Sequence, residues 1–120
     1  MDNKGPDGEH APKEVISVSA RKINPGQQKD YDDWLRHYMI LERNAPGYLG
    51  TTIICPGGTM SSVRYRVSRW AGKSSLDACE YSQQSLELIE EANKFSQEFL
   101  CSMISFTTFL LSPFHNNIQN

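Results

Sequence analysis

The sequence has few cysteines, no long apolar run and no concentration of charge of one sign, and each absence excludes a class of protein. The three cysteines, Cys55, Cys79 and Cys101, are far apart, odd in number and without a Cys-x-x-Cys motif. They therefore predict neither a disulfide framework nor a structural zinc site. Reduced thiols in a cytoplasmic protein are the expectation.

Charge and hydrophobicity limit the partners further. A net charge of −2, with dispersed Lys and Arg, gives no general attraction to nucleic acid or to an anionic membrane. The most apolar run, residues 99–111, is too short and too rich in Ser and Thr to cross a bilayer. Residues 1–13 are polar and lack the apolar core of a signal peptide. We therefore expect neither nucleic-acid nor membrane binding.

The length of 120 residues indicates one domain. We place it at residues 14–111, between a disordered N-terminal tail at 1–13 and a C-terminal tail at 112–120. A hydrophobic fraction of 38% is slightly low for a closed core. A small chain with an open sheet often completes its core with a second copy, so a homodimer is expected.

The first half of the chain alternates between strand and helix periodicity. Residues 14–23 alternate as a strand does, and residues 27–44 then repeat apolar side chains at helical spacing. Residues 48–55 are rich in β-branched side chains, and residues 61–70 alternate sharply. Pro-Gly pairs separate these segments and specify turns.

The second half predicts a broken helix and a last strand. Ser74 or Ser75 is the expected cap of a helix that is interrupted and capped again near Ser82. The apolar stripe of its second piece is expected to contain Leu86, Ile89, Ala92, Phe95 and Phe99. Residues 101–111 then read as a strand, with a boundary near residue 100. The resulting strand–helix–strand–strand–helix–strand order is that of a ferredoxin-like α+β fold with an antiparallel sheet.

The residues of these motifs and their order resemble those of a known family. The matching pieces are Ser19-Ala20-Arg21-Lys22, Pro25-Gly26 with Tyr31 and Trp34-Leu35, Ala45-Pro46-Gly47-Tyr48-Leu49-Gly50, Val67-Ser68-Arg69-Trp70, and the helix broken at Ser82. Over about residues 15–95 the chain resembles the antibiotic biosynthesis monooxygenase-like family. The resemblance implies a dimeric α+β barrel with a substrate pocket between sheet and helices in each subunit. Its best-understood members oxygenate phenols or quinols with O₂ and no cofactor, so the implied partners are a small aromatic molecule and O₂.

Such a reaction needs a dry pocket, donors for an oxyanion and a base. Arg66 and Trp70 share one face of their predicted strand and are candidates to stabilise and orient a phenolate. Salt bridges or core packing at a dimer interface would explain the same two residues. His37 is a candidate base, although it lies close to the solvent side of its helix.

Five further residues are candidate substrate contacts. They are Trp34, Tyr38, Ser17, Ser19 and Cys79. Trp34 and Tyr38 lie one turn apart on the inner side of a helix, where core packing is the alternative. The resemblance places Ser17 and Ser19 where haem-degrading relatives carry asparagine, and Cys79 where tryptophan is frequent. A small buried hydrophobe is the alternative for Cys79.

The resemblance also argues against haem chemistry. The haem-degrading members need a histidine where this chain has Ile89, and no histidine lies between His37 and His115. No metal site is therefore expected. The sequence leaves two functions open: a cofactor-independent monooxygenase for a small aromatic, quinol or polyketide-like substrate, and a non-catalytic ligand-binding or stress-related dimer. A cyclase or isomerase is a third option that would depend on His37.

Overall fold

The computed structural model describes residues 13–105 and contains one four-stranded sheet with three α-helices. The elements are β2 (Val15–Ile23), α2 (Gln28–Arg43), β3 (Tyr48–Ile54), the short 3₁₀ helix η1 (Gly58–Met60), β4 (Val63–Trp70), α3 (Lys73–Glu80), α4 (Gln83–Ala92) and β5 (Ser96–Ser105). Residues 1–12 of the expected N-terminal tail, residues 106–111 of the expected last strand and the expected C-terminal tail lie outside the described residues.

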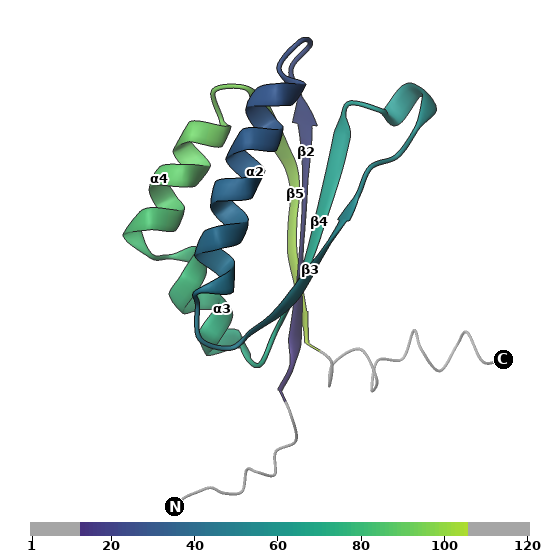
Figure 1. Cartoon of the computed structure of the whole chain (residues 1–120). Helices are drawn as coiled ribbons and strands as arrows, with labels where there is room; N and C mark the ends of the chain where they lie inside the picture. The colour runs from purple at the N-terminus through teal and green to yellow at the C-terminus, as the bar shows by residue number, and fades with distance from the viewer. Residues whose placement is uncertain (1–12, 106–120) are drawn as a thin grey trace, which may run out of the picture.

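The sheet has the order β3-β4-β2-β5, and every neighbouring pair is antiparallel. The three helices form a layer on one face of the sheet, no helix of residues 13–105 lies on the other face, and the β3–β4 hairpin leans away from the helices (Figure 1). This arrangement confirms the predicted ferredoxin-like α+β fold. It also creates a layer between sheet and helices in which a site could be enclosed.

The face of β2 that meets the helices is the polar one. Ser17, Ser19 and Arg21 are each less than 9% exposed, and the partners of Ser17 and Ser19 on β4 are Ser68 and Arg66. Directly paired residues of antiparallel strands project from the same face. The sequence therefore buries a polar surface under its helices and leaves the apolar side of β2 facing outward.

Two apolar clusters hold the helices on the sheet. The first contains Ile23, Tyr31, Trp34, Tyr38, Ala92 and Phe95, and the second contains Val15, Trp70, Leu76 and Cys79. The clusters lie at the two ends of β2, since Ile23 belongs to one and Val15 to the other. The polar layer lies between these two apolar ends.

Two predicted boundaries were wrong. The last strand begins at Ser96 rather than near residue 101, because Ser96 already pairs with Ile23 and the Phe95 carbonyl accepts a hydrogen bond from the Asn24 amide. Phe99 therefore belongs to β5 and is 53% exposed. Likewise, α3 begins at Lys73 with Gly72 as its N-cap and no side-chain cap, so neither Ser74 nor Ser75 has the expected role.

The interruption of the second helix was predicted correctly. Ser82 is the N-cap of α4, and its Oγ accepts a hydrogen bond of 3.2 Å from the Ser85 amide. The inward stripe of α4 is rotated from the prediction, because Ser85 and Ala92 are buried whereas Leu86 is 49% exposed. The cap at Ser82 fixes which side chains of α4 face inward, so that Ser85 rather than Leu86 points toward α2.

Gly47 is the turn residue with the most stringent requirement. Its φ is +86°, and a Cβ built there would lie 2.5 Å from the Cβ of Ser75 on α3. We expect Gly47→Ala to lower the free energy of unfolding by about 1–3 kcal/mol, through the disfavoured φ and the clash together. Gly26→Ala is the matched control, since Gly26 has a φ of +78° but open space around it. Equal losses in urea denaturation would show that the α3 contact contributes nothing.

Candidate functional site

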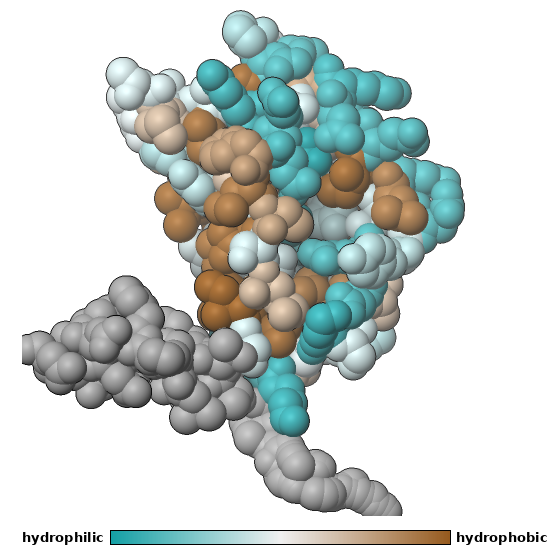
Figure 2. Space-filling view, turned by 180° about the vertical axis from the view of Figure 1, so that it is seen from behind, coloured by the Kyte–Doolittle hydropathy of each residue, from teal (hydrophilic) through white to brown (hydrophobic). Residues whose placement is uncertain are grey.

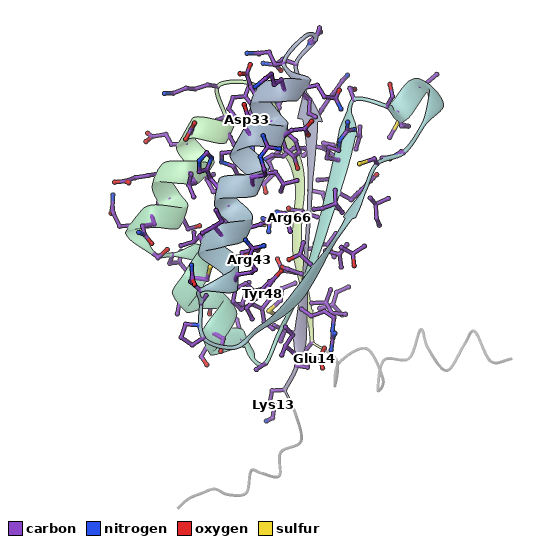
Figure 3. All side chains as sticks on the ribbon, viewed as in Figure 1. Lys13, Glu14, Asp33, Arg43, Tyr48 and Arg66 are labelled. Carbon is purple, nitrogen blue, oxygen red and sulfur yellow. The ribbon has the colours of Figure 1, made fainter. Side chains whose placement is uncertain are left out.

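A buried ion pair crosses the layer between sheet and helices. Arg66 on β4 donates through Nη1 to Glu42 Oε2 on α2 at 2.6 Å, and the two side chains are 10% and 3% exposed. Figure 3 shows Arg66 projecting from the sheet toward the helices. Removing two charges from water is costly, so this pair depends on further contacts in the layer.

Those contacts come from two side chains, Thr51 and Tyr38. Glu42 Oε1 accepts a hydrogen bond of 3.2 Å from Thr51, and the Arg66 guanidinium lies 4.6 Å from the centroid of the Tyr38 ring. Burial raises the pKa of Glu42, while Arg66 and Thr51 act in the opposite direction. Burial is the largest single influence on Arg66 and opposes its charge, but Glu42, Tyr38 and Tyr31 together raise the pKa of the guanidinium. Arg66 is therefore a fixed cation inside the layer.

Trp70 is held by its neighbours at the end of β4. It is 1% exposed, its Nε1 donates to Ser68 Oγ at 3.0 Å, and the Tyr48 ring meets it edge-on at 5.3 Å. Aromatic pairs favour this edge-to-face arrangement. The structure therefore places Trp70 on the helix-facing side, as its shared face with Arg66 predicted, and packs it within an apolar cluster.

A groove opens into the layer between α3 and β5. It has a volume of about 230 Å³ and is lined by Ser17, Lys73, Leu76, Asp77, Glu80, Tyr81, Cys101, Ser102 and Met103. Ser17 Oγ donates to Glu80 Oε2 at 3.3 Å. Burial raises the pKa of Glu80, and the nearby Arg66 charge is among the influences that lower it. The groove thus brings a proton acceptor within the electrostatic reach of the buried cation.

The structure gathers most of the predicted substrate contacts around this layer. Ser17 lines the groove, and Ser19 pairs with Arg66 on one side and Cys101 on the other. Tyr38 donates to or accepts from Ser85 Oγ at 2.8 Å. Trp34 stacks on Tyr38, and its Nε1 donates to the Leu88 carbonyl at 2.7 Å, which is a core role.

His37 lies apart from these residues. It is on the exposed side of α2, and its Nδ1 is 2.9 Å from the Asp33 carbonyl oxygen, one turn earlier in the same helix. A side chain on that side cannot reach a proton in the layer. The predicted candidate base therefore does not meet the other candidates.

Neither Glu42 nor Glu80 was predicted from the sequence as a site residue, and only Glu42 lies in a sequence pattern that could have indicated its role. Glu42 follows Tyr38 by four residues on the inner stripe of α2, opposite a strand that carries alternate arginines. A carboxylate in that position indicates a buried ion pair. Glu80 carries no such signal, because its place in the groove depends on where α3 ends.

Cys79 is buried and 5% exposed, and burial raises the pKa of its thiol to about 11. We expect iodoacetamide at pH 8 to modify Cys79 about a hundredfold or more slowly than the exposed Cys55, because the thiolate is the nucleophile. Mass spectrometry of tryptic peptides over time measures both rates. Comparable rates in the folded protein would contradict the buried position, and urea should remove the difference.

Residues 13–105 contain no group of three or more His, Cys, Asp or Glu side chains placed to hold a metal ion. Among the helices of the same region, none has both the length and the apolar character needed to cross a bilayer.

Comparison with known proteins gives a clear result for structure and none for sequence. No family model matches the chain, and no curated protein matches it in sequence. SnoaB, a cofactor-independent oxygenase from Streptomyces nogalater, superposes with a TM-score of 0.68 at 11% identity, covering 77% of this chain and 91% of SnoaB.

Two candidate antibiotic biosynthesis monooxygenases are similar to the same degree. The protein from Nitrosomonas europaea has a TM-score of 0.70 at 9% identity, covering 86% of this chain and 95% of its own. The protein from Bordetella bronchiseptica has a TM-score of 0.65 at 12% identity, covering 77% and 95%. The protein therefore has the fold of the antibiotic biosynthesis monooxygenase-like proteins, as its motifs predicted.

Proposed function

We propose that the protein is a cofactor-independent oxygenase for a small phenolic, quinol or polyketide-like substrate. The observation that carries the proposal is the half-buried groove carboxylate Glu80, which feels the charge of the buried Arg66 in the layer between sheet and helices. A carboxylate whose pKa is raised by burial is suited to accept a proton near neutral pH. The fold shared with SnoaB supports this chemistry without identifying the substrate.

The roles follow from position. Glu80 takes a proton from an acidic C–H or O–H group of the substrate, and the Arg66 charge stabilises the oxyanion that forms. The electron-rich anion, rather than a flavin or metal, then reduces O₂. For an anthrone-like methylene, one oxygen atom enters as C=O and the other leaves as water with the two methylene hydrogens, so atoms and electrons balance. Ser17 contacts the substrate in the groove, and Ser19, Tyr38, Trp70 and Cys79 support the site from within the layer.

The test is O₂ uptake with a panel of hydroquinones and anthrones in air. We expect uptake above the rate without protein for at least one compound, and a lower rate for Arg66→Ala and Trp70→Phe. Circular dichroism and thermal unfolding identify variants that fail to fold. Uptake no higher than that of the two variants across the panel would refute the oxygenase proposal.

Two observations favour a non-catalytic ligand-binding function instead. The groove volume of about 230 Å³ is below the roughly 300–1,000 Å³ typical of small-molecule sites, and Arg66 is already paired with Glu42. If tryptophan fluorescence shows that a panel compound binds while no O₂ is consumed, the second function is favoured.

We place either function in a reducing compartment such as the cytoplasm, a proposal that the three free cysteines support.

We also propose a homodimer that covers the open sheet face. Figure 2 shows hydrophobic side chains gathered in a vertical band on the sheet side of the molecule, beside hydrophilic helices. Ile54, Leu100 and Ile104 are each at least 40% exposed in the single chain. Light scattering after size exclusion should give twice the chain mass, and Val18→Asp, on the uncovered face of β2, should reduce it. A monomer at micromolar concentration would refute this part.

A further inference from the structure

A groove on the outer surface of the helical layer lies between α2 and α4. The two helices are neighbours in that layer (Figure 1). One part of the groove has a volume of about 510 Å³. None of its lining residues belongs to the groove between α3 and β5, so it is a separate surface that the proposed reaction does not use.

Matching stripes of the two helices form the walls of this part. The residues of α2 are His37, Ile40, Leu41 and Asn44. The residues of α4 are Gln84, Glu87, Leu88 and Glu91. Both sets have the i, i+3, i+4, i+7 spacing of one helix face. Leu41 and Leu88 are half-buried and pack on the core beneath them, whereas Ile40 is 48% exposed. The groove therefore has an apolar floor that extends over about two turns of each helix.

The rim of the groove is acidic. A second depression of about 770 Å³ continues the groove toward the end of α4, and both parts are lined by Glu87 and Glu91. Asp30 and Glu90 add two more carboxylates to the second part, and Lys94 is its one cation. None of the four carboxylates forms an ion pair within residues 13–105. The apolar floor is thus bordered by an excess of negative charge.

The position of these charges lowers the stability of the free chain. Glu90 and Glu91 lie in the last turn of α4, which has no basic residue, although the dipole of a helix favours cations there. Glu87 precedes them by three and four residues, a spacing at which like charges repel each other. A cation supplied by a partner would relieve both repulsions.

The segments outside the described residues do not supply that cation. Residues 1–12 contain one lysine against three carboxylates, and residues 106–120 contain no Lys or Arg. A second copy of the chain carries the same net charge of −2. Nucleic acid and anionic lipid are repelled by the carboxylates of the rim. Charge complementarity therefore favours a cationic segment of another protein.

A helix suits the groove better than an extended segment does. The hydrogen bonds of a helical backbone are internal, and the side chains of a third helix can pack between those of two neighbouring helices. An extended segment over Leu41 and Leu88 would instead bury backbone polar groups against apolar side chains that offer no hydrogen bond.

We propose that the groove between α2 and α4 binds a basic amphipathic helix of another protein. Apolar side chains of that helix, repeated at i, i+3, i+4 and i+7, contact Ile40, Leu41 and Leu88 on the floor. Its Lys or Arg side chains lie over the carboxylates of the rim, Glu87 and Glu91 among them.

The probe is a fluorescein-labelled peptide of Leu and Lys, about 14 residues long, whose leucines follow one helix face. Fluorescence anisotropy with the full chain measures its affinity. We expect it to bind about tenfold or more tightly than a peptide with Glu in place of every Lys, and than a scrambled peptide of the same composition. High salt should weaken the binding, because the charges of the rim are exposed.

Two matched pairs of variants test the groove itself. Glu91→Lys should weaken binding about fivefold or more, whereas Asp32→Lys, the same charge change at an exposed position of α2 outside the groove, should change it less than about twofold. Ile40→Ser should also weaken binding. Leu86→Ser should not, since Leu86 is 49% exposed on α4 but does not line the groove. Circular dichroism checks that all four variants are folded.

Several results would overturn the proposal. They are equal binding of the Leu–Glu peptide, an unchanged affinity in Glu91→Lys or Ile40→Ser, and a loss in Asp32→Lys as large as that in Glu91→Lys. A lower mass of Ile40→Ser in light scattering would place a second copy of this chain in the groove instead. Nuclear Overhauser contacts between Ile40 and residues 106–114 in the free chain would show that its own segment fills the groove. Because O₂ uptake does not involve this surface, the oxygenase proposal is tested separately.

Discussion

Glu42→Gln is expected to lower the free energy of unfolding by about 3–5 kcal/mol, the largest stability loss predicted for any single change in this chain. The substitution keeps the shape of the side chain and leaves the Arg66 cation 10% exposed without its counter-charge. Breaking a buried pair by removing one partner has this cost because an uncompensated charge stays in the interior. Urea denaturation monitored by circular dichroism at neutral pH gives the value.

Two further variants separate the ion pair from simple loss of packing. Asp33→Asn removes a carboxylate from an exposed pair on the same helix and should leave stability unchanged. The double variant Glu42→Leu, Arg66→Met should recover most of the loss, because buried pairs can often be replaced by apolar side chains of similar volume. A double variant as unstable as Glu42→Gln would mean that Glu42 contributes through Thr51 rather than through Arg66.

Glu80→Gln is expected to reduce the oxygenation rate by about a hundredfold or more while the protein stays folded. The change keeps the size of the side chain that bonds to Ser17 and removes its capacity to accept a proton. Asp77→Asn is the matched control, since Asp77 lines the same groove and pairs with Lys73 at the surface. A rate unchanged in Glu80→Gln would remove Glu80 from the mechanism.

The pH dependence of Glu80 gives an independent check with a definite sign. Burial raises its folded-state pKa above the ordinary 4.5, so folding favours the protonated form. The resulting stability is fully present below pH 4.5 and is lost as the pH rises through the raised value. Glu80→Gln should therefore become more stable relative to the unmodified protein as the pH rises. The oxygenation rate of the unmodified protein should fall as the pH drops through the same raised value.

The sequence was informative about turns and alternation because these depend on neighbouring residues. Pro25-Gly26 and Gly47 specify conformations that few other residues adopt, and they correctly marked the ends of β2 and α2. The start of β5 at Ser96 was missed, since it is determined by pairing with Ile23, more than 70 residues away. Apolar periodicity alone predicts that the preceding helix continues through Ser96.

Only part of the candidate site could be predicted from the sequence, for the same reason. Arg66 was recognisable as a candidate from the sequence. Residues of a strand point alternately to the two faces of the sheet, so an arginine there must face either the helices or the open side. Its partner Glu42 comes from another element, and the choice of face depends on which side the helices cover. The position of Glu80 depends on the end of α3 and its approach to β2. Such long-range geometry has no local signature in one sequence.

Turnover under ¹⁸O₂ tests the central claim, oxygenation in the layer between sheet and helices, most directly. With an anthrone that supports O₂ uptake, mass spectrometry should find one labelled oxygen atom per product molecule and the other in water. The incorporation should be lost in Glu80→Gln. Uptake that yields hydrogen peroxide with unlabelled product, or labelled product at the same rate in Glu80→Gln, would contradict the account.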